Sequence, residues 1–131
     1  MERAVEQLQD AWARLQVDVN CGLRRGAWYP VLRITRENAV LEVTREPLPV
    51  PRRYLQTISS RPFRWTVVPR PRDAANLPSD WGSRYAVCPV CRHRAPISGR
   101  PVDMRCPRCN GTFQVAWDER YLPEPQRRPK T

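Results

Sequence analysis

Lysine, histidine and glycine are scarce in this chain of 131 residues. Lys130 is its one lysine, and it has one histidine and five glycines. No stretch reaches the roughly 18 to 20 apolar residues that cross a bilayer, and the first residues include Glu2, Glu6 and Asp10. Five cysteines are too few for a disulfide-rich secreted scaffold. We therefore expect a cytoplasmic protein without a signal peptide or a transmembrane segment.

The groups that carry most enzyme chemistry are also missing from the sequence. It contains no Ser-His-Asp set, no glycine-rich phosphate loop and no clustered pair of carboxylates. We therefore predict a non-catalytic protein that has no catalytic residues and takes no small-molecule substrate.

Positive charge is plentiful, and almost all of it is arginine. The net charge is +10, the pI is about 10.4, and 22 of the 23 basic residues are arginine. A GC-rich genome would also produce this arginine bias. Residues 21–72 hold eleven arginines against three glutamates. This balance predicts a polyanionic partner, which is nucleic acid, a larger protein complex or an anionic membrane surface.

The N-terminal segment has the apolar spacing of a helix. Val5, Leu8 and Trp12 recur at intervals of three and four, which predicts an amphipathic helix over residues 2–16 within a segment 1–18. The helix either packs on its own domain or docks on another subunit through Trp12.

Strand patterns follow. Runs rich in Val, Ile, Leu and aromatic residues at 27–35, 38–44 and 63–68 predict strands, the first two joined in a hairpin. They predict a small curled β-sheet or partly open barrel over residues 19–70. With the N-terminal helix, the fold class is small α+β, mostly β. Proline-rich residues 71–83 are predicted to be a linker.

The strongest pattern is a pair of CPxC motifs. Cys88 and Cys91 are separated by two residues, as are Cys106 and Cys109, and fourteen residues lie between the pairs. We call residues 88–91 the first knuckle and 106–109 the second knuckle. Four thiolates brought together in this way suit one structural Zn²⁺ with a closed shell. Iron binding and thiol exchange are alternatives that are less consistent with two paired motifs.

Residues 84–118 resemble the zinc-ribbon family. The resemblance rests on the two CPxC knuckles, the Ile-x-Gly between them and the Phe-x-Val strand after them. It implies a C-terminal four-cysteine zinc ribbon but no particular function. Arg92 and Asn110 stand where family members usually have glycine. His93 is either an exposed residue of the turn or a substitute ligand. Residues 119–131 form a basic, proline-rich tail.

One interpretation of the arginines is nucleic-acid binding. Basic strands with exposed aromatics bind single strands through phosphate contacts and base stacking. The aromatics involved are Trp28, Tyr29, Tyr54, Phe63 and Trp65, which otherwise form a hydrophobic core. The candidate nucleic-acid or partner-binding residues are Arg24, Arg25, Arg33, Arg52, Arg53, Arg64, Arg92, Arg94, Arg105 and Arg108.

The alternative is a structural or adaptor subunit of a larger assembly, such as one at the cytoplasmic face of a membrane complex. Five tryptophans are many for so small a core, and tryptophan is a frequent interface anchor. The candidate anchors are Trp12, Trp81 and Trp117.

Overall fold

The computed structural model describes residues 11–71 and 77–122. The chain divides into two compact units, Met1–Pro62 (the first unit) and Phe63–Thr131 (the second unit). The sequence pattern had assigned residues 63–70 to the same domain as the strands before them. Within the described residues, no helix has the length and apolar character that a membrane crossing requires.

The predicted α+β class with an N-terminal helix is wrong. The protein is nearly all β, and the C-terminal part of the predicted helix is strand β1 (Trp12–Leu15). This strand pairs on one side with β2 (Tyr29–Ile34) and on the other with β5 (Leu55–Ile58). Residues 2–10 of the predicted helix lie outside the described residues. Pairing on two sides and burial overrode a local helical spacing.

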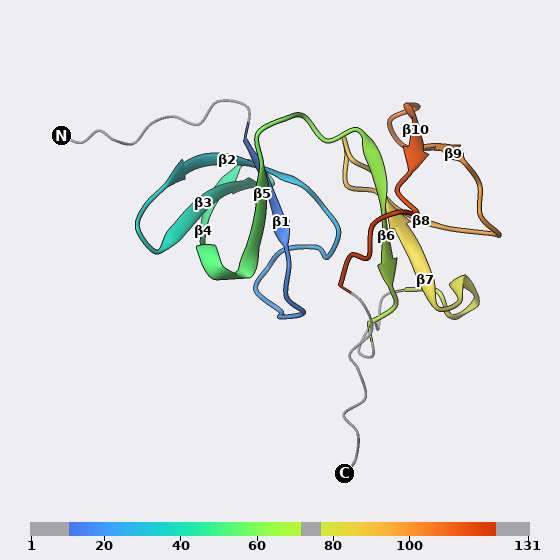
Figure 1. Cartoon of the computed structure of the whole chain (residues 1–131), viewed down its shortest axis with the longest axis horizontal. Coiled ribbons are helices and arrows are strands. Elements are labelled where there is room, and N and C mark those ends of the chain that lie inside the picture. Colours follow the sequence, from blue (N-terminus) through green and yellow to red (C-terminus); the bar gives the residue numbers. More distant parts are fainter. Residues whose placement is uncertain (1–10, 72–76, 123–131) are drawn as a thin grey trace, which may run out of the picture. The chain divides into compact units, whose positions relative to one another are not determined.

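The first unit holds a curled five-stranded sheet in the order β4-β3-β2-β1-β5 (Figure 1). Its remaining strands are β3 (Asn38–Val43) and β4 (Glu46–Pro51), and a 3-10 turn, η1 (Arg52–Tyr54), precedes β5. β2 and β3 are antiparallel, which confirms the predicted hairpin. Leu15, Leu41 and Val50 are fully buried in this unit.

Prolines close one edge of this sheet. Pro47, Pro49 and Pro51 occupy alternate positions of the edge strand β4. Backbone groups of an antiparallel strand point alternately toward and away from its neighbour, and proline has no N–H to donate. The alternate prolines therefore remove donors from the outer edge while the residues between them pair with β3.

Arg14, on strand β1 next to the edge strand β5, is buried in the same sheet. It is 3% exposed, its Nε donates to Gln56 Oε1 at 2.9 Å, and its guanidinium lies 4.4 Å from the centroid of the Trp28 ring. A buried cation is tolerated because hydrogen bonding and the aromatic ring replace its water.

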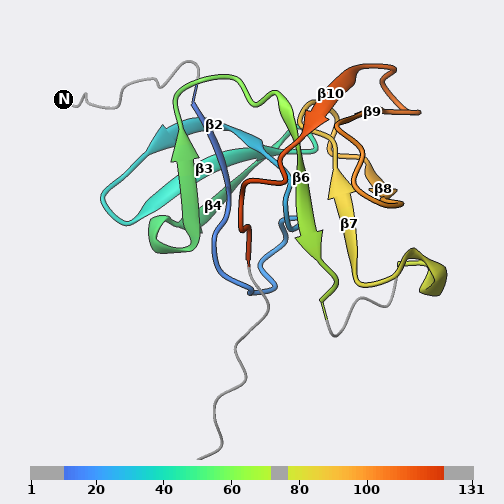
Figure 2. The ribbon, with the colours of Figure 1, turned by 45° about the vertical axis from the view of Figure 1, so that its right-hand side comes forward.

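The second unit holds another five-stranded sheet, in the order β8-β7-β6-β10-β9 (Figure 2). Its central strand is β6 (Arg64–Pro69), and a 3-10 turn, η2 (Ser79–Trp81), precedes β7. The other strands are β7 (Arg84–Val87), β8 (Arg94–Pro96), β9 (Asp103–Arg105) and β10 (Thr112–Val115). β6 and β10 are parallel, and the remaining pairs are antiparallel.

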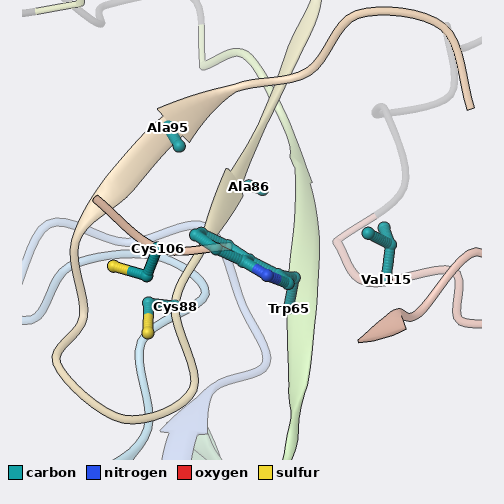
Figure 3. Close-up of a cluster of buried hydrophobic side chains, with 6 residues drawn as sticks. All are labelled: Trp65, Ala86, Cys88, Ala95, Cys106 and Val115. Atoms are coloured by element: carbon teal, nitrogen blue, oxygen red, sulfur yellow. The ribbon is translucent and has the colours of Figure 1, made fainter. Parts of the chain in front are cut away.

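Trp65 forms the centre of the core of the second unit. The ring extends from β6 toward Cys88 and Cys106 (Figure 3). Its exposure is 0%, and its Nε1 donates to the backbone oxygen of Met104 at 2.9 Å. Phe63, two residues before Trp65 in the sequence, is 65% exposed.

Candidate metal centre

The two knuckles have the same backbone structure. Each begins directly after a strand, the first after β7 and the second after β9. The amide of Arg92 donates to the oxygen of Cys88 at 3.2 Å, and the amide of Asn110 donates to that of Cys106 at 2.8 Å. In each turn the amide of the first cysteine also donates to a carbonyl beyond the second cysteine. The Cys88 amide donates to the oxygen of His93, and the Cys106 amide donates to that of Gly111.

The two departures from the family pattern lie at matching positions of these turns. Arg92 and Asn110 have φ angles of 66° and 67°, in the left-handed region that glycine adopts without strain. Asparagine tolerates this region, whereas arginine pays a penalty of roughly 1 kcal/mol or more there. The turn is therefore kept without its usual glycine.

The four sulfurs form one compact cluster. Cys88 Sγ lies 3.8 Å from Cys109 Sγ, Cys91 Sγ lies 3.6 Å from Cys106 Sγ, and all four sulfurs lie within 4.8 Å of one another. A tetrahedron with metal–sulfur bonds of about 2.3 Å separates its sulfurs by about 3.8 Å. All four cysteines are free of disulfides. They are positioned to bind one metal ion, as a zinc-ribbon-like motif requires.

Backbone amides donate to two of the four sulfurs. The amide of Val90 donates to Cys88 Sγ, and that of Arg108 donates to Cys106 Sγ, both at 3.4 Å. Both are amides two residues after the first cysteine of a knuckle. They supply partial positive charge where a metal-bound sulfur carries negative charge.

The pKa values of three of the thiols, Cys88, Cys91 and Cys106, depart from the ordinary value. Burial raises the pKa of Cys88 to about 12 and also raises that of Cys91. Burial acts in the same direction on Cys106, but hydrogen bonds with the amides of Cys109 and Arg108 and with neighbouring thiols together outweigh it and lower the pKa of that thiol. Buried thiols lose their protons readily only when a cation compensates the charge. A bound cation would therefore favour deprotonation of the buried thiols of this cluster.

The metal centre is continuous with the core. Cys88 and Cys106, the first cysteine of each knuckle, have 0% exposure and pack with Trp65, while Cys109 is exposed. His93 supplies a carbonyl to the first knuckle and is outside the sulfur cluster. The cysteine pairs could be found from spacing, but their contact with β6 could not.

The predicted binding arginines differ in their side-chain partners and in their exposure. Arg64 bonds Asp118 at 2.7 Å, and Arg25 forms an ion pair with Asp18. Arg105 donates to Asn110 Oδ1 at 2.9 Å beside the second knuckle. The exposed members of the predicted set are Arg24, Arg33, Arg52, Arg53, Arg105 and Arg108, and the half-buried ones are Arg25, Arg64, Arg92 and Arg94.

Most aromatic residues proposed for base stacking belong to the core. Trp28, Tyr29 and Trp65 are 7%, 4% and 0% exposed, so their faces are unavailable to a base. Tyr54 is half-buried with Arg53 5.1 Å from its ring centroid, and Phe63 alone of the five is well exposed. The alternative that these aromatics form a core holds for the first three.

The candidate interface tryptophans contact their own chain. The guanidinium of Arg61 lies over the ring of Trp12, and Trp81 lies 6.3 Å from Tyr85 between ring centroids. Trp117 has two arginines, at positions 84 and 100, over its ring, and its Nε1 donates to the oxygen of Pro101 at 2.8 Å.

The positive charge of the described residues is divided evenly between the two units. Among the described residues, each unit holds nine arginines and four acidic residues, a net charge of +5. Residues 21–72, the most basic segment of the sequence, are divided between the two units. Arg36, in the first unit, is exposed, and its carbonyl accepts a hydrogen bond from Arg52. That contact depends on the pairing of β2 with β3, and no local sequence pattern indicates it.

Compared with models of protein families, with curated proteins and with solved structures, the chain shows no significant match.

Proposed function

We propose that this is a non-catalytic zinc protein that binds nucleic acid through its arginine surface. The observation that carries the binding role is the number of exposed arginines that lack acidic partners. In the described part of the chain, the exposed arginines without a side-chain hydrogen bond or ion pair include Arg33, Arg36, Arg45, Arg108 and Arg120. Guanidinium groups with free donors match phosphate oxygens in geometry and charge.

The metal is proposed to be structural zinc. Four sulfur donors complete a tetrahedron and leave no position for a reactive water. Two of the donors also belong to the core. Zinc would then stabilise the second unit and hold the arginines near the knuckles, including Arg105 and Arg108, in place.

Metal analysis tests the zinc assignment, and Cys21 provides a matched control. Cys21 is a free, half-buried cysteine of the first unit. We expect one zinc per chain in the wild type and in Cys21→Ser, and loss of zinc in Cys106→Ser. Iron in the purified protein, or full zinc content in Cys106→Ser, would contradict the assignment.

Binding is proposed to use phosphate contacts with little base stacking, because Trp28, Tyr29 and Trp65 are buried. Such binding has weak sequence preference and a steep salt dependence. Titration of labelled single-stranded and duplex oligonucleotides over a salt series provides the test. Absence of binding to either at about 50 mM salt, where phosphate contacts are strongest, would refute the role.

A second candidate, an adaptor subunit, is favoured by two exposed apolar side chains of the second unit. Val90 on the first knuckle and Val102 before β9 are 54% and 72% exposed. A protein partner docked on this part of the second unit would cover them. Under this alternative, Val90→Ser with Val102→Ser removes a copurifying protein and leaves oligonucleotide binding unchanged. If the protein binds nucleic acid alone, the double variant changes neither copurification nor oligonucleotide binding.

A further inference from the structure

Two segments far apart in the sequence meet at one end of the first sheet. They are the turn between β2 and β3, residues 35–37, and η1, which follows β4 (Figures 1 and 2). Arg52 joins them, because its Nη1 donates to the oxygens of Thr35 and Arg36 at 3.2 and 3.4 Å. Its amide also donates to the oxygen of Glu37 at 2.9 Å.

This contact gathers three exposed arginines. Arg36 comes from the turn, and Arg52 and Arg53 come from η1. Glu37 is the one acidic residue in either segment, and none of the three guanidinium groups forms an ion pair within the described residues. Arg33 is excluded, because it lies next to Ile34 in β2 and successive side chains of a strand point to opposite faces.

A hollow lies beside these arginines. Its volume is about 270 Å³, and its lining residues are Ile34, Ala39, Arg52, Arg53, Leu55 and Thr57. Pockets that enclose drug-sized ligands begin at about 300 Å³. This hollow therefore suits one planar group the size of a base, with apolar side chains below it and arginines and a hydroxyl at its rim.

We propose that this end of the first sheet binds a single-stranded nucleic acid, with neighbouring phosphates on Arg36 and Arg53 and one unstacked base in the hollow. The inference rests on the proposed function and locates it. Single strands offer bases free to leave the stack, whereas a duplex does not. Arg52 is a positioning residue, because its hydrogen bonds to the β2–β3 turn hold that turn beside η1.

Arg45 offers a matched control for the phosphate contacts. It is exposed and forms no ion pair within the described residues, and it lies in the turn at the opposite end of β3. The test measures fluorescence anisotropy of a labelled 12-nucleotide oligo-U with wild type, Arg36→Gln/Arg53→Gln and Arg45→Gln over a salt series. Arg52 is kept so that the turn stays in place, and unfolding midpoints of all three proteins are compared.

Each single-strand phosphate contact contributes about 0.7 to the slope of log affinity against log salt. The double variant should lower the magnitude of the slope by about 1.4 and weaken binding about 10-fold at 0.15 M salt. Arg45→Gln should change affinity less than 2-fold. Thr57→Phe, which fills the hollow from its exposed rim, should remove any preference for oligo-U over an abasic strand and keep the salt slope.

The other outcomes separate the site from the general role. Equal weakening by Arg45→Gln and by the double variant would overturn this site and leave nucleic-acid binding standing. Equal binding of oligo-U and the abasic strand by the wild type would overturn the base in the hollow. Binding to phosphatidylserine vesicles, with none to oligo-U, would overturn both the site as stated and the proposed function.

Discussion

Replacing Trp65 with phenylalanine measures how strongly the core of the second unit supports the metal centre. The indole fills the space beside Cys88 and Cys106 and bonds the oxygen of Met104. Phenylalanine keeps an aromatic ring there but removes the N–H and part of the volume. The substitution therefore weakens packing behind two of the four sulfurs without altering a ligand.

The magnitude follows from these two losses. A buried carbonyl that loses its donor costs about 1 to 3 kcal/mol, and the space left by the smaller ring costs about 1 to 2 kcal/mol. A total near 3 kcal/mol corresponds to about 100-fold in an equilibrium constant. Metal binding by small zinc units is coupled to their folding. We therefore expect zinc affinity to fall by about 100-fold.

Competition with a chromophoric chelator measures the affinity, and Trp28→Phe is the matched control. Trp28 is also buried, at 7% exposure, but belongs to the first unit. Its replacement should lower the unfolding midpoint of that unit and leave zinc affinity within about 2-fold. Unchanged zinc affinity in Trp65→Phe, despite a lowered unfolding midpoint, would refute the coupling of core and metal centre.

Three further predictions concern backbone strain, packing and charge. Thr44 and Arg45, in the β3–β4 turn, have φ angles of 51° and 70°, so Asn-Gly there should raise the free energy of unfolding by about 1 to 2 kcal/mol in urea titrations; no gain would contradict the strain. A Cβ on Gly111 would meet the Phe113 ring at 2.4 Å, so Gly111→Ala should destabilise the second unit by about 1 to 3 kcal/mol. Adding Phe113→Ala should relieve that penalty, because it removes the ring that the new Cβ meets. The pKa of Asp118 is lowered by its bond from the arginine that begins β6, so its stabilising effect is present above the ordinary aspartate pKa and is lost as pH falls through the lowered value. The stability difference between wild type and Asp118→Asn should accordingly vanish in acid, and a difference that grows there would contradict it.

The metal site could be predicted because its chemistry is local. Two residues between paired cysteines define each knuckle without reference to the rest of the chain, and the four sulfurs meet as the spacing predicted. The β2–β3 hairpin was predictable for the same reason. Its two strands are neighbours in sequence, and a short polar turn joins them.

The parts that could not be predicted depend on distant pairing. Trp12–Leu15 is a strand because residues 29–30 and 55–58 lie on its two sides, which its apolar spacing does not encode. β6 joins the second sheet through parallel pairing with β10, about fifty residues later in the chain. The arginine cluster around Arg52 likewise exists only after β2, β3 and β4 have paired.

The parallel pairing of β6 with β10 has a practical consequence for dissecting the chain. A peptide limited to residues 84–118 contains every cysteine of the metal centre but lacks the central strand of its sheet and the ring of Trp65. Such a peptide would expose the inner faces of Cys88 and Cys106 to water. A transplantable zinc module should therefore begin at Phe63, where the second unit begins, and not at the strand that enters the first knuckle.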